Sequence, residues 1–225
     1  MQAADLFSLS DTFPFRDRFP GEAKPWEWLP LIKEVLKDFD FDPTDLPSQP
    51  GVHIKGDVYL APSVKLPPYC VIEGPAWIGP ETEIRPGAYI RGNVIVGAGC
   101  VLGNACEFKN CLLMDDVQTP HYNYVGDSIL GNKSHLGAGV ICSNLRLDQK
   151  HISVVLPDGV YETGLRKFGA ILADAAEVGC NAALQPGTIL AKRSVVGPAL
   201  AFGGYLEPQT MAFGRAEIRR LPRRD

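Results

Sequence analysis

Large apolar residues recur along the middle of the chain at a strict interval of six positions. One register runs through ten consecutive members: Ile54, Leu60, Leu66, Ile72, Ile78, Ile84, Ile90, Val96, Leu102 and Phe108. A second stripe of small or medium residues lies four positions after each of the first nine: Val58, Val64, Cys70, Ala76, Thr82, Ala88, Val94, Cys100 and Cys106. Both stripes return between 130 and 202. Because neither a helix nor an ordinary strand has this period, the pattern predicts a repeat architecture.

Hexapeptide repeats of this kind are typical of the left-handed parallel β-helix, where each unit makes one short strand and one corner, and three units make a coil. We therefore expect a mainly β fold with the large residues inside a prism. Gly and Pro are frequent between the stripes, as in IRPGAYI and VGAGCVL. They suit corners because Gly adopts positive φ and Pro restricts φ. A β-sandwich would instead show period-two alternation and hairpin signals.

The first 50 residues have a different texture and predict an amphipathic helix within 25–42. Its apolar positions have helical spacing: Trp26, Leu29, Ile32, Val35, Leu36 and Phe39. This aromatic face could dock on the prism or on a neighbouring chain. We expect an N-terminal helical extension and linker at 1–50, a β-helix domain at 51–205 and a tail at 206–225. An insertion at about 145–168 predicts a protruding loop, with a small hairpin around LPDG.

Composition narrows the function. The formal net charge of −4 gives no bulk attraction to nucleic acid or anionic lipid. The start of the chain lacks the pattern of a signal peptide, and no apolar run is long enough for a membrane span. Six cysteines show no C-x-x-C spacing, and three of them occupy the small stripe as compact hydrophobes. These features favour a cytoplasmic protein without nucleic-acid or membrane partners.

The register slips between Phe108 and Leu130, and a polar motif begins inside the slip. The residues from His121 to Asn144 read HYNYVGDSILGNKSHLGAGVICSN. This stretch resembles the acetyltransferase half of the bifunctional bacterial enzyme that acetylates glucosamine-1-phosphate and then uridylylates it. That family carries H-x-x-Y-x-G-D, then I-G-A-G-type and C-N elements, with an Asn and a Lys six apart, here Asn144 and Lys150. The match covers about 75–200, and we expect the uridyltransferase half to be absent.

The chemistry of acetyl transfer points to His121. The attacking amine must lose a proton, and histidine is the usual base for that step near neutral pH. The resemblance implies that Glu107 orients the histidine and that Tyr124 binds substrate. The alternative is that each of these is an ordinary exposed polar residue.

A sugar phosphate requires cations. Arg91 and Lys109 are separated by three hexapeptides, which make one full coil, so they should stack on one corner as a phosphate clamp. Local similarity of IRPGA would instead place the family arginine at Arg85. Arg91 ranks first because Arg85 is four hexapeptides from Lys109, which is not a whole number of coils. By resemblance, Lys150 contacts the phosphate from the neighbouring subunit.

The resemblance also implies a route for acetyl-CoA along the coils beyond the histidine. Ala138 and Asn144 would lie beside the thioester, with Asn144 near the substrate amine, and Ala170 and Arg215 would follow the pantetheine and nucleotide. A backbone N–H near Ala138 could stabilise the tetrahedral oxyanion.

Two positions depart from the family pattern. His135 stands where the family has an asparagine that contacts the sugar nucleotide, and Leu145 replaces a tyrosine beside the cofactor. These departures affect the expected substrate more than the expected reaction.

Together these features predict an acetyl-CoA-dependent N-acetyltransferase for an amino-sugar 1-phosphate, in nucleotide-sugar and cell-envelope precursor synthesis. We expect a homotrimer with sites between adjacent prisms, no metal requirement, and a separate nucleotidyltransferase as a candidate partner. One alternative is a non-catalytic module that trimerises or regulates a sugar nucleotidyltransferase. Another is a zinc enzyme like the β-helix carbonic anhydrases, but histidines 53, 121, 135 and 151 lack the H-x-x-x-x-H pair of that family.

Overall fold

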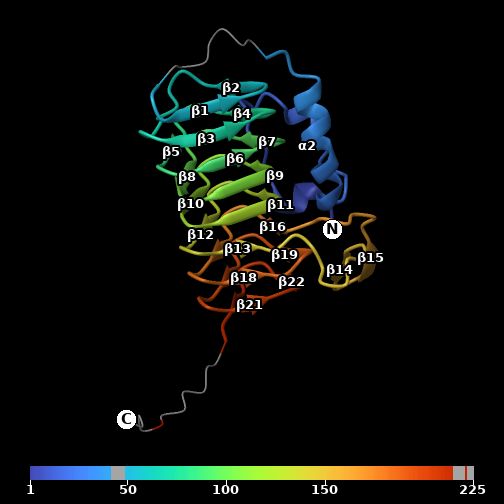
Figure 1. Cartoon of the computed structure of the whole chain (residues 1–225). Coiled ribbons are helices and arrows are strands. Elements are labelled where there is room, and N and C mark those ends of the chain that lie inside the picture. Colours follow the sequence, from blue (N-terminus) through green and yellow to red (C-terminus); the bar gives the residue numbers. More distant parts are fainter. Residues whose placement is uncertain (42–48, 215–220, 222–225) are drawn as a thin grey trace.

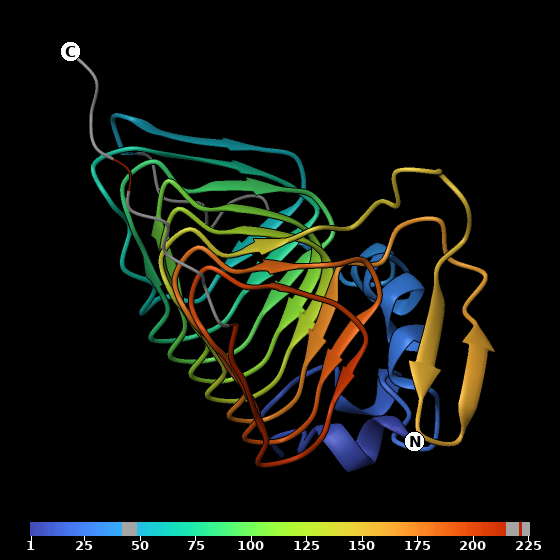
Figure 2. The ribbon, with the colours of Figure 1, turned by 90° about the horizontal axis from the view of Figure 1, so that it is seen from below.

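The chain winds into a stack of coils with three flat faces, seen from the side in Figure 1 and from below in Figure 2. This is a computed structural model, and it describes residues 1–41, 49–214 and 221. Successive coils pair in parallel along each face. The mainly β, left-handed parallel β-helix predicted from the six-residue period is confirmed.

We number the faces 1 to 3 in chain order. Face 1 holds β1 (Val52–Lys55), β3 (Cys70–Glu73), β6 (Tyr89–Arg91), the first parts of β9 (Glu107–Leu113) and β11 (Tyr124–Leu130), β13 (Ile141–Cys142), β18 (Ala183–Leu184) and β21 (Ala201–Phe202). Face 2 holds β2 (Val58–Leu60), β4 (Ala76–Ile78), β7 (Val94–Val96), the last parts of β9 and β11, β16 (Ala170–Leu172), β19 (Thr188–Leu190) and β22 (Tyr205–Leu206). Face 3 holds β5 (Glu83–Ile84), β8 (Val101–Asn104), β10 (Gln118–His121), β12 (His135–Leu136), β17 (Glu177–Val178), β20 (Val195–Val196) and β23 (Met211–Ala212).

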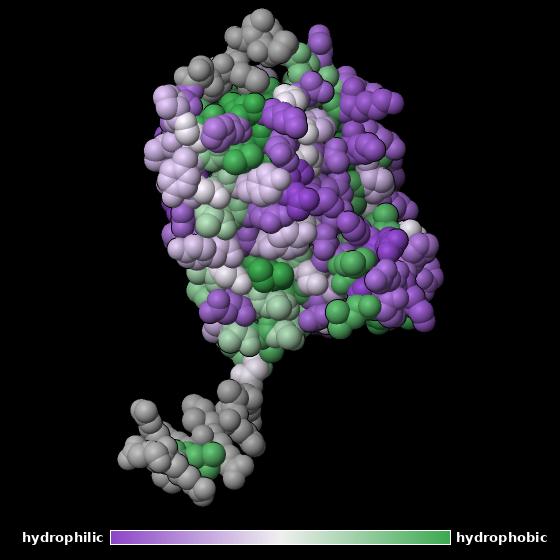
Figure 3. Space-filling model, in the orientation of Figure 1, coloured by the Kyte–Doolittle hydropathy of each residue, from purple (hydrophilic) through white to green (hydrophobic). Residues whose placement is uncertain are grey.

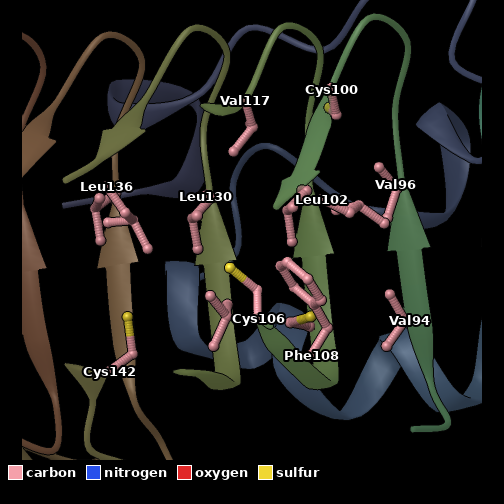
Figure 4. Packing of buried hydrophobic residues seen from close by; sticks show 14 of the residues in the cluster. Val94, Val96, Cys100, Leu102, Cys106, Phe108, Val117, Leu130, Leu136 and Cys142 are labelled. Atoms are coloured by element: carbon pink, nitrogen blue, oxygen red, sulfur yellow. The ribbon is translucent and has the colours of Figure 1, made fainter. Parts of the chain in front are cut away.

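Both predicted stripes fill the prism. The large stripe is wholly buried from Ile72 through Phe108, apart from 2% exposure at Ile84, and the small stripe packs beside it. Figure 4 shows Leu102, Phe108, Leu130 and Leu136 inside the prism, together with the side chains of Cys106 and Cys142. Polar members of the small stripe are satisfied by the backbone, as where the Thr82 hydroxyl donates to the Gly97 carbonyl at 3.1 Å.

The register slip is the loss of one residue at the corner between faces 1 and 2. Glu107 pairs with Tyr89, 18 positions earlier, but with Tyr124, only 17 positions later. At the shortened corner, β9 and β11 each turn through one left-handed residue, Asn110 at φ 47° and Asp127 at φ 46°. Asn and Asp tolerate this conformation better than other residues with a side chain.

The N-terminal segment covers face 2. It contains α1 (Ala3–Leu6), η1 (Arg16–Arg18), η2 (Pro25–Glu27) and α2 (Trp28–Lys37), and α2 runs along the stack in Figure 1. Face 2 offers one large apolar residue per coil to this segment; we call this row the face 2 stripe: Tyr59, Trp77, Ile95, Leu112, Ile129, Ile171, Ile189 and Tyr205. The predicted helix is confirmed in a shorter form, and it docks on the prism of its own chain.

The predicted insertion leaves the prism and carries the expected hairpin. Strands β14 (Ser153–Leu156) and β15 (Gly159–Glu162) pair antiparallel around the turn at 157–158. The Tyr161 ring lies 5.8 Å from the Trp26 ring and 4.5 Å from the Lys24 Nζ. The N-terminal segment therefore contacts the hairpin, which lies outside this segment in Figure 2.

The coils continue beyond the boundary expected at residue 205. Strands β22 and β23 pair with β19 and β20. The reason is visible in the small stripe, which extends to Leu206 and Ala212, whereas Pro208 ends the large stripe. Within the described residues, no helix combines the length and apolarity needed to cross a bilayer.

Candidate functional site

A column of outward-facing residues crosses the middle of face 1. The register stacks Tyr89, Glu107, Tyr124 and Ile141 in successive coils. Arg91 follows Tyr89 by two positions in β6, so it points from the same side of the strand. Figure 3 shows hydrophilic surface in the area where Figure 1 shows β6, β9 and β11. This polar face is the candidate site.

Arg91 and Glu107 form an ion pair, with the Arg91 Nη1 at 2.7 Å from the Glu107 Oε1. This bond raises the pKa of the Arg91 guanidinium, whose Cζ also lies 5.7 Å from the centre of the Tyr89 ring. Both charged side chains are more than a third exposed, so the pair contributes at most about 1 kcal/mol. In the described chain, Glu107 is thus bonded to Arg91, and its predicted role of orienting His121 stays a prediction.

Lys109 lies one coil after Arg91, as the spacing of three hexapeptides predicted. Its Nζ is 3.4 Å from the Asp127 Oδ2. The rival Arg85 donates from Nε to Glu83 at 2.9 Å, and both of these residues lie at face 3. Register therefore groups Arg91 with Lys109 on one face and separates Arg85 from them.

His121 ends β10 and stands exposed at the corner between faces 3 and 1. It stacks between Asn104 of the coil before and Ala138 of the coil after, and its carbonyl accepts from the Gly139 N–H at 3.0 Å. The corner is fixed by Asn123, whose side chain is buried and donates from Nδ2 to the Gly137 carbonyl at 2.7 Å. The imidazole is therefore free to meet solvent or substrate.

Asn144 connects Tyr124 to a buried carboxylate. Its Nδ2 lies 3.3 Å from the Tyr124 Oη and 2.5 Å from the Asp127 Oδ2. The pKa of the Tyr124 phenol is raised, first by burial and then by the charges of Glu107 and Asp127. Tyr124 therefore keeps its proton and can donate a hydrogen bond across the physiological range.

The remaining predicted residues lie around this centre. His135 is partly exposed on face 3, between Gln118 and Glu177 in the stack. Lys150 is exposed in the insertion. The Ala170 side chain is buried inside the prism, and its N–H donates to the Ser128 Oγ at 3.0 Å. Arg215 falls outside the described residues.

A family model described as the GMPPB C-terminal domain matches residues 72–202, which is more than half of the chain and includes all of face 1 around the site. The chain belongs to this family. The matched range holds His121, Tyr124 and Asn144, and it leaves out the N-terminal segment that covers face 2.

Individual relatives are similar to most of this chain. The bifunctional protein GlmU of Methanococcus aeolicus is 31% identical over 197 residues, which cover 87% of this chain and 47% of the relative. The uncharacterized acetyltransferase YaiX of Escherichia coli O6:K15:H31 is 30% identical over 164 residues, covering 73% of this chain and 71% of the relative. The chain spans about half the length of the GlmU relatives it matches.

Among solved structures, a UDP-N-acetylglucosamine acyltransferase of Francisella novicida covers 65% of this chain and 52% of its own, with 15% identity and a TM-score of 0.42. A TM-score this low adds nothing to the description of the fold that the coil register already gives. Sequence and fold together identify a left-handed β-helix domain of the hexapeptide acyltransferase type.

Within this family member, one residue at the site had no role in the sequence predictions. Asp127 belongs to the motif that begins at His121, yet only the structure shows that it is buried and bonded to both Lys109 and Asn144. A signal was present in the sequence, since Asn110, Asp127 and Asn144 follow one another at the length of one shortened coil. Across the described residues, no cluster of three His, Cys, Asp or Glu side chains could hold a metal ion.

Proposed function

We propose that this protein is an acetyl-CoA-dependent N-acetyltransferase that acts on an amino-sugar 1-phosphate. The observation that carries the proposal is a group of four residues: Arg91, Lys109 and Tyr124 on face 1, with Asn144 at its corner with face 2. His121 lies at the opposite corner of face 1. The two cations suit a phosphate, and the phenol and the amide can form hydrogen bonds with a sugar and its amine. The name of one relative, a bifunctional sugar-1-phosphate nucleotidylyltransferase/acetyltransferase of Sulfurisphaera tokodaii, supports a sugar 1-phosphate as the substrate class.

In the proposed reaction, His121 takes a proton from the amine of the sugar as the amine nitrogen attacks the carbonyl carbon of the thioester. The new bond is the amide C–N bond. The C–S bond breaks, and coenzyme A leaves. Ala138 is stacked directly after His121, so a backbone N–H at that corner is a candidate donor to the oxyanion.

Binding of the phosphate must compete with two carboxylates. Arg91 is paired with Glu107, and Lys109 is paired with Asp127. A phosphate dianion forms charge-assisted, bidentate bonds to guanidinium and carries more charge than one carboxylate. Substrate binding would therefore draw Arg91 away from Glu107 and leave that carboxylate available to a second partner such as His121.

The donor and the assembly follow from the same proposal. Acetyl-CoA would lie along the coils after His121, with Asn144 beside the thioester, and it could reach Ala170 only through the backbone because the methyl group is buried. A cytoplasmic homotrimer would bring the exposed Lys150 of one chain towards the phosphate bound to the next.

A non-catalytic module that trimerises or regulates a sugar nucleotidyltransferase is the second candidate. One contact favours it: Glu107 is bonded to Arg91, and no hydrogen bond joins it to His121 among the described residues. In that case the same face would bind a sugar phosphate without turning it over.

The deciding experiment measures release of coenzyme A from acetyl-CoA with glucosamine-1-phosphate and with galactosamine-1-phosphate. We expect turnover by the wild type and a loss of about a hundredfold or more in His121→Ala, the low end for a general base. His53→Ala is the matched control, because His53 is also exposed but lies in β1, the first coil. A folded wild type that binds the sugar phosphate without releasing coenzyme A would establish the non-catalytic module instead.

A further inference from the structure

The corner between faces 1 and 2 carries a ladder of short polar side chains, which we call the corner ladder. It consists of Asn93, Asn110, Asp127 and Asn144, which follow one another at a constant spacing, the length of one shortened coil. The first three adopt left-handed φ, at 54°, 47° and 46°. Asp127 is the only charged member, and it sits between two asparagines.

Three donors surround the Asp127 carboxylate. From the coil before, the Asn110 Nδ2 donates to Oδ1 at 2.9 Å and the Lys109 Nζ approaches Oδ2 at 3.4 Å. From the coil after, the Asn144 Nδ2 donates to Oδ2 at 2.5 Å. Asp127 is only 5% exposed, and a buried carboxylate is costly unless such bonds satisfy it. The carboxylate is therefore fixed, and it fixes its donors in return.

Backbone hydrogen bonds at the same corner join the two ends of the insertion, a region that we call its neck. The chain leaves the prism after Asn144 and returns at Phe168, whose N–H donates to the Asn144 carbonyl at 3.0 Å. The Gly169 N–H donates to the Asp127 carbonyl at 2.7 Å. Gly169 lies so close to the Gly126 carbonyl that a Cβ would collide with it. Asp127 thus bonds to the residues on both sides of the neck.

We propose that Asp127 is a positioning residue of the acetyltransferase site. It holds the Lys109 ammonium from one side and the Asn144 amide from the other, and it anchors the insertion that carries Lys150. The inference rests on the proposed function, because Lys109 and Asn144 are substrate contacts only in that function. Asp127 acts through these neighbours rather than on the substrate.

The proposed role of Asp127 depends on the negative charge of its carboxylate as well as on its shape. An asparagine at this position would keep the size and the left-handed φ, but it would turn one acceptor oxygen into an NH₂ group facing other donors. The Lys109 ammonium would lose its fixed partner and reorient. We expect such a variant to fold and to misplace two substrate contacts.

The test compares Asp127→Asn with Asp174→Asn. Asp174 also lies at a corner, between faces 2 and 3, where its Oδ1 accepts from the Asn132 N–H and Nδ2, both at 2.9 Å. We expect kcat/KM for the amino-sugar phosphate to fall about tenfold or more in Asp127→Asn, the effect of one charge-assisted hydrogen bond. Asp174→Asn should stay within about twofold of wild type, as expected away from a site. Equal values for both variants would overturn the inference.

A double variant separates positioning from general stability. Because Asp127 acts in part through Lys109, the losses from Asp127→Asn and Lys109→Met should overlap, so that the double variant loses less than the product of the two single losses. Independent losses that multiply would contradict the role assigned to Asp127. Should Asp127→Asn fail to fold, Asn110→Gly removes a donor while tolerating positive φ. A loss of kcat/KM in Asn110→Gly that is smaller than the loss of about tenfold expected of Asp127→Asn supports the inference. An Asn110→Gly variant with the kcat/KM of the wild type overturns it.

A second readout does not depend on catalysis. The insertion contains Arg146, Lys150 and Arg166, so trypsin reports the opening of its neck. Cleavage should be faster in Asp127→Asn than in Asp174→Asn at equal overall stability, and equal rates would overturn the anchoring role. If the wild type turns over no amino-sugar phosphate, the proposed function fails, and the trypsin rates still decide whether Asp127 anchors the insertion.

Discussion

Cys70, Cys100 and Cys142 lie inside the prism, where burial raises the pKa of their thiols to about 11, about 12 and about 12. Cys106 and Cys111 are also buried, with raised pKa values of the same cause. Cys180 differs, because it is exposed at the corner between faces 3 and 1, stacked after Ala138. Position in the coil, rather than residue type, therefore separates inert from accessible thiols.

At pH 8 we expect a maleimide to label Cys180 alone in the native protein, and all six cysteines after unfolding. A buried thiol with a pKa of about 11 is ionised in only about one molecule in a thousand at this pH. Mass spectrometry of the labelled protein, with Cys180→Ser as control, gives the count. Rapid native labelling of a second thiol would show that the prism opens.

These same thiols predict the direction of alkaline instability. Their folded pKa lies above the ordinary value of 9.0, so the folded state binds its proton more tightly than the unfolded state does. Their contribution is fully present below pH 9 and is lost as the pH rises towards 12. Urea midpoints measured at pH 8 and pH 10 should fall with pH, and by less in Cys100→Ala. An equal fall in that variant would contradict the assignment.

At the residue scale, spacing predicted which side chains share a face but not which ones bond. Arg91, Lys109 and Tyr124 occupy face 1 because coil length fixes their register. The ion pair between Arg91 and Glu107 was not predictable, because two carboxylates lie near two cations and only side-chain geometry chooses the partner. The role of Asp127 was not predictable for a related reason: it lies at a corner that, like the one at Asn110, is one residue shorter than the corners of the earlier coils.

At the scale of elements, the N-terminal segment and the face 2 stripe form one apolar cluster. Trp28 lies at its centre with 1% exposure. Its ring stacks on Phe7 at 5.2 Å, and its Nε1 donates to the Pro20 carbonyl at 2.9 Å. The Trp28 side chain thus connects α2 to the segment just after α1 and to the segment between η1 and η2.

Trp28→Ala should lower the free energy of unfolding by about 3 to 5 kcal/mol, the usual cost of removing a buried tryptophan. Urea denaturation followed by circular dichroism measures the loss. Leu147→Ala is the control, because Leu147 is fully exposed. A loss below about 1 kcal/mol would show that the segment adds little to the stability of the prism.

The helix was predictable from its apolar spacing, but its docking surface was not. The signal for that surface was present: Tyr59, Trp77 and Ile95 follow one another at intervals of three hexapeptides, each just before a large-stripe position. A row of large apolar residues on the outside of a prism needs a cover. The six-residue pattern predicts only which residues point into the prism.

At the scale of the whole molecule, face 2 is covered by the N-terminal segment of its own chain, whereas faces 1 and 3 carry exposed residues such as Ile141 and Glu177 within the part of the chain that the structure describes. Tyr122 and Ile141 are 61% and 40% exposed near the site. Exposed apolar residues beside a polar site favour an interface between chains. This is the arrangement that the proposed homotrimer requires.

Sedimentation equilibrium should give a mass three times the 24.5 kDa of one chain. Ile141→Glu should shift the protein towards the monomer, because a charge in an apolar contact would lose its hydration. Val155→Glu, on the exposed outer side of the hairpin, should leave the mass unchanged. A monomeric wild type would contradict shared sites between chains.

The cover on face 2 also has a mechanical consequence. A stack of parallel coils, each touching only its neighbours, can be peeled apart one coil at a time under tension along its axis. The N-terminal segment resists this separation, because it packs against the face 2 stripe across successive coils. A force along the stack must break the contacts of the N-terminal segment before any central coil can separate. The central coils, which carry the candidate site, would therefore unfold together.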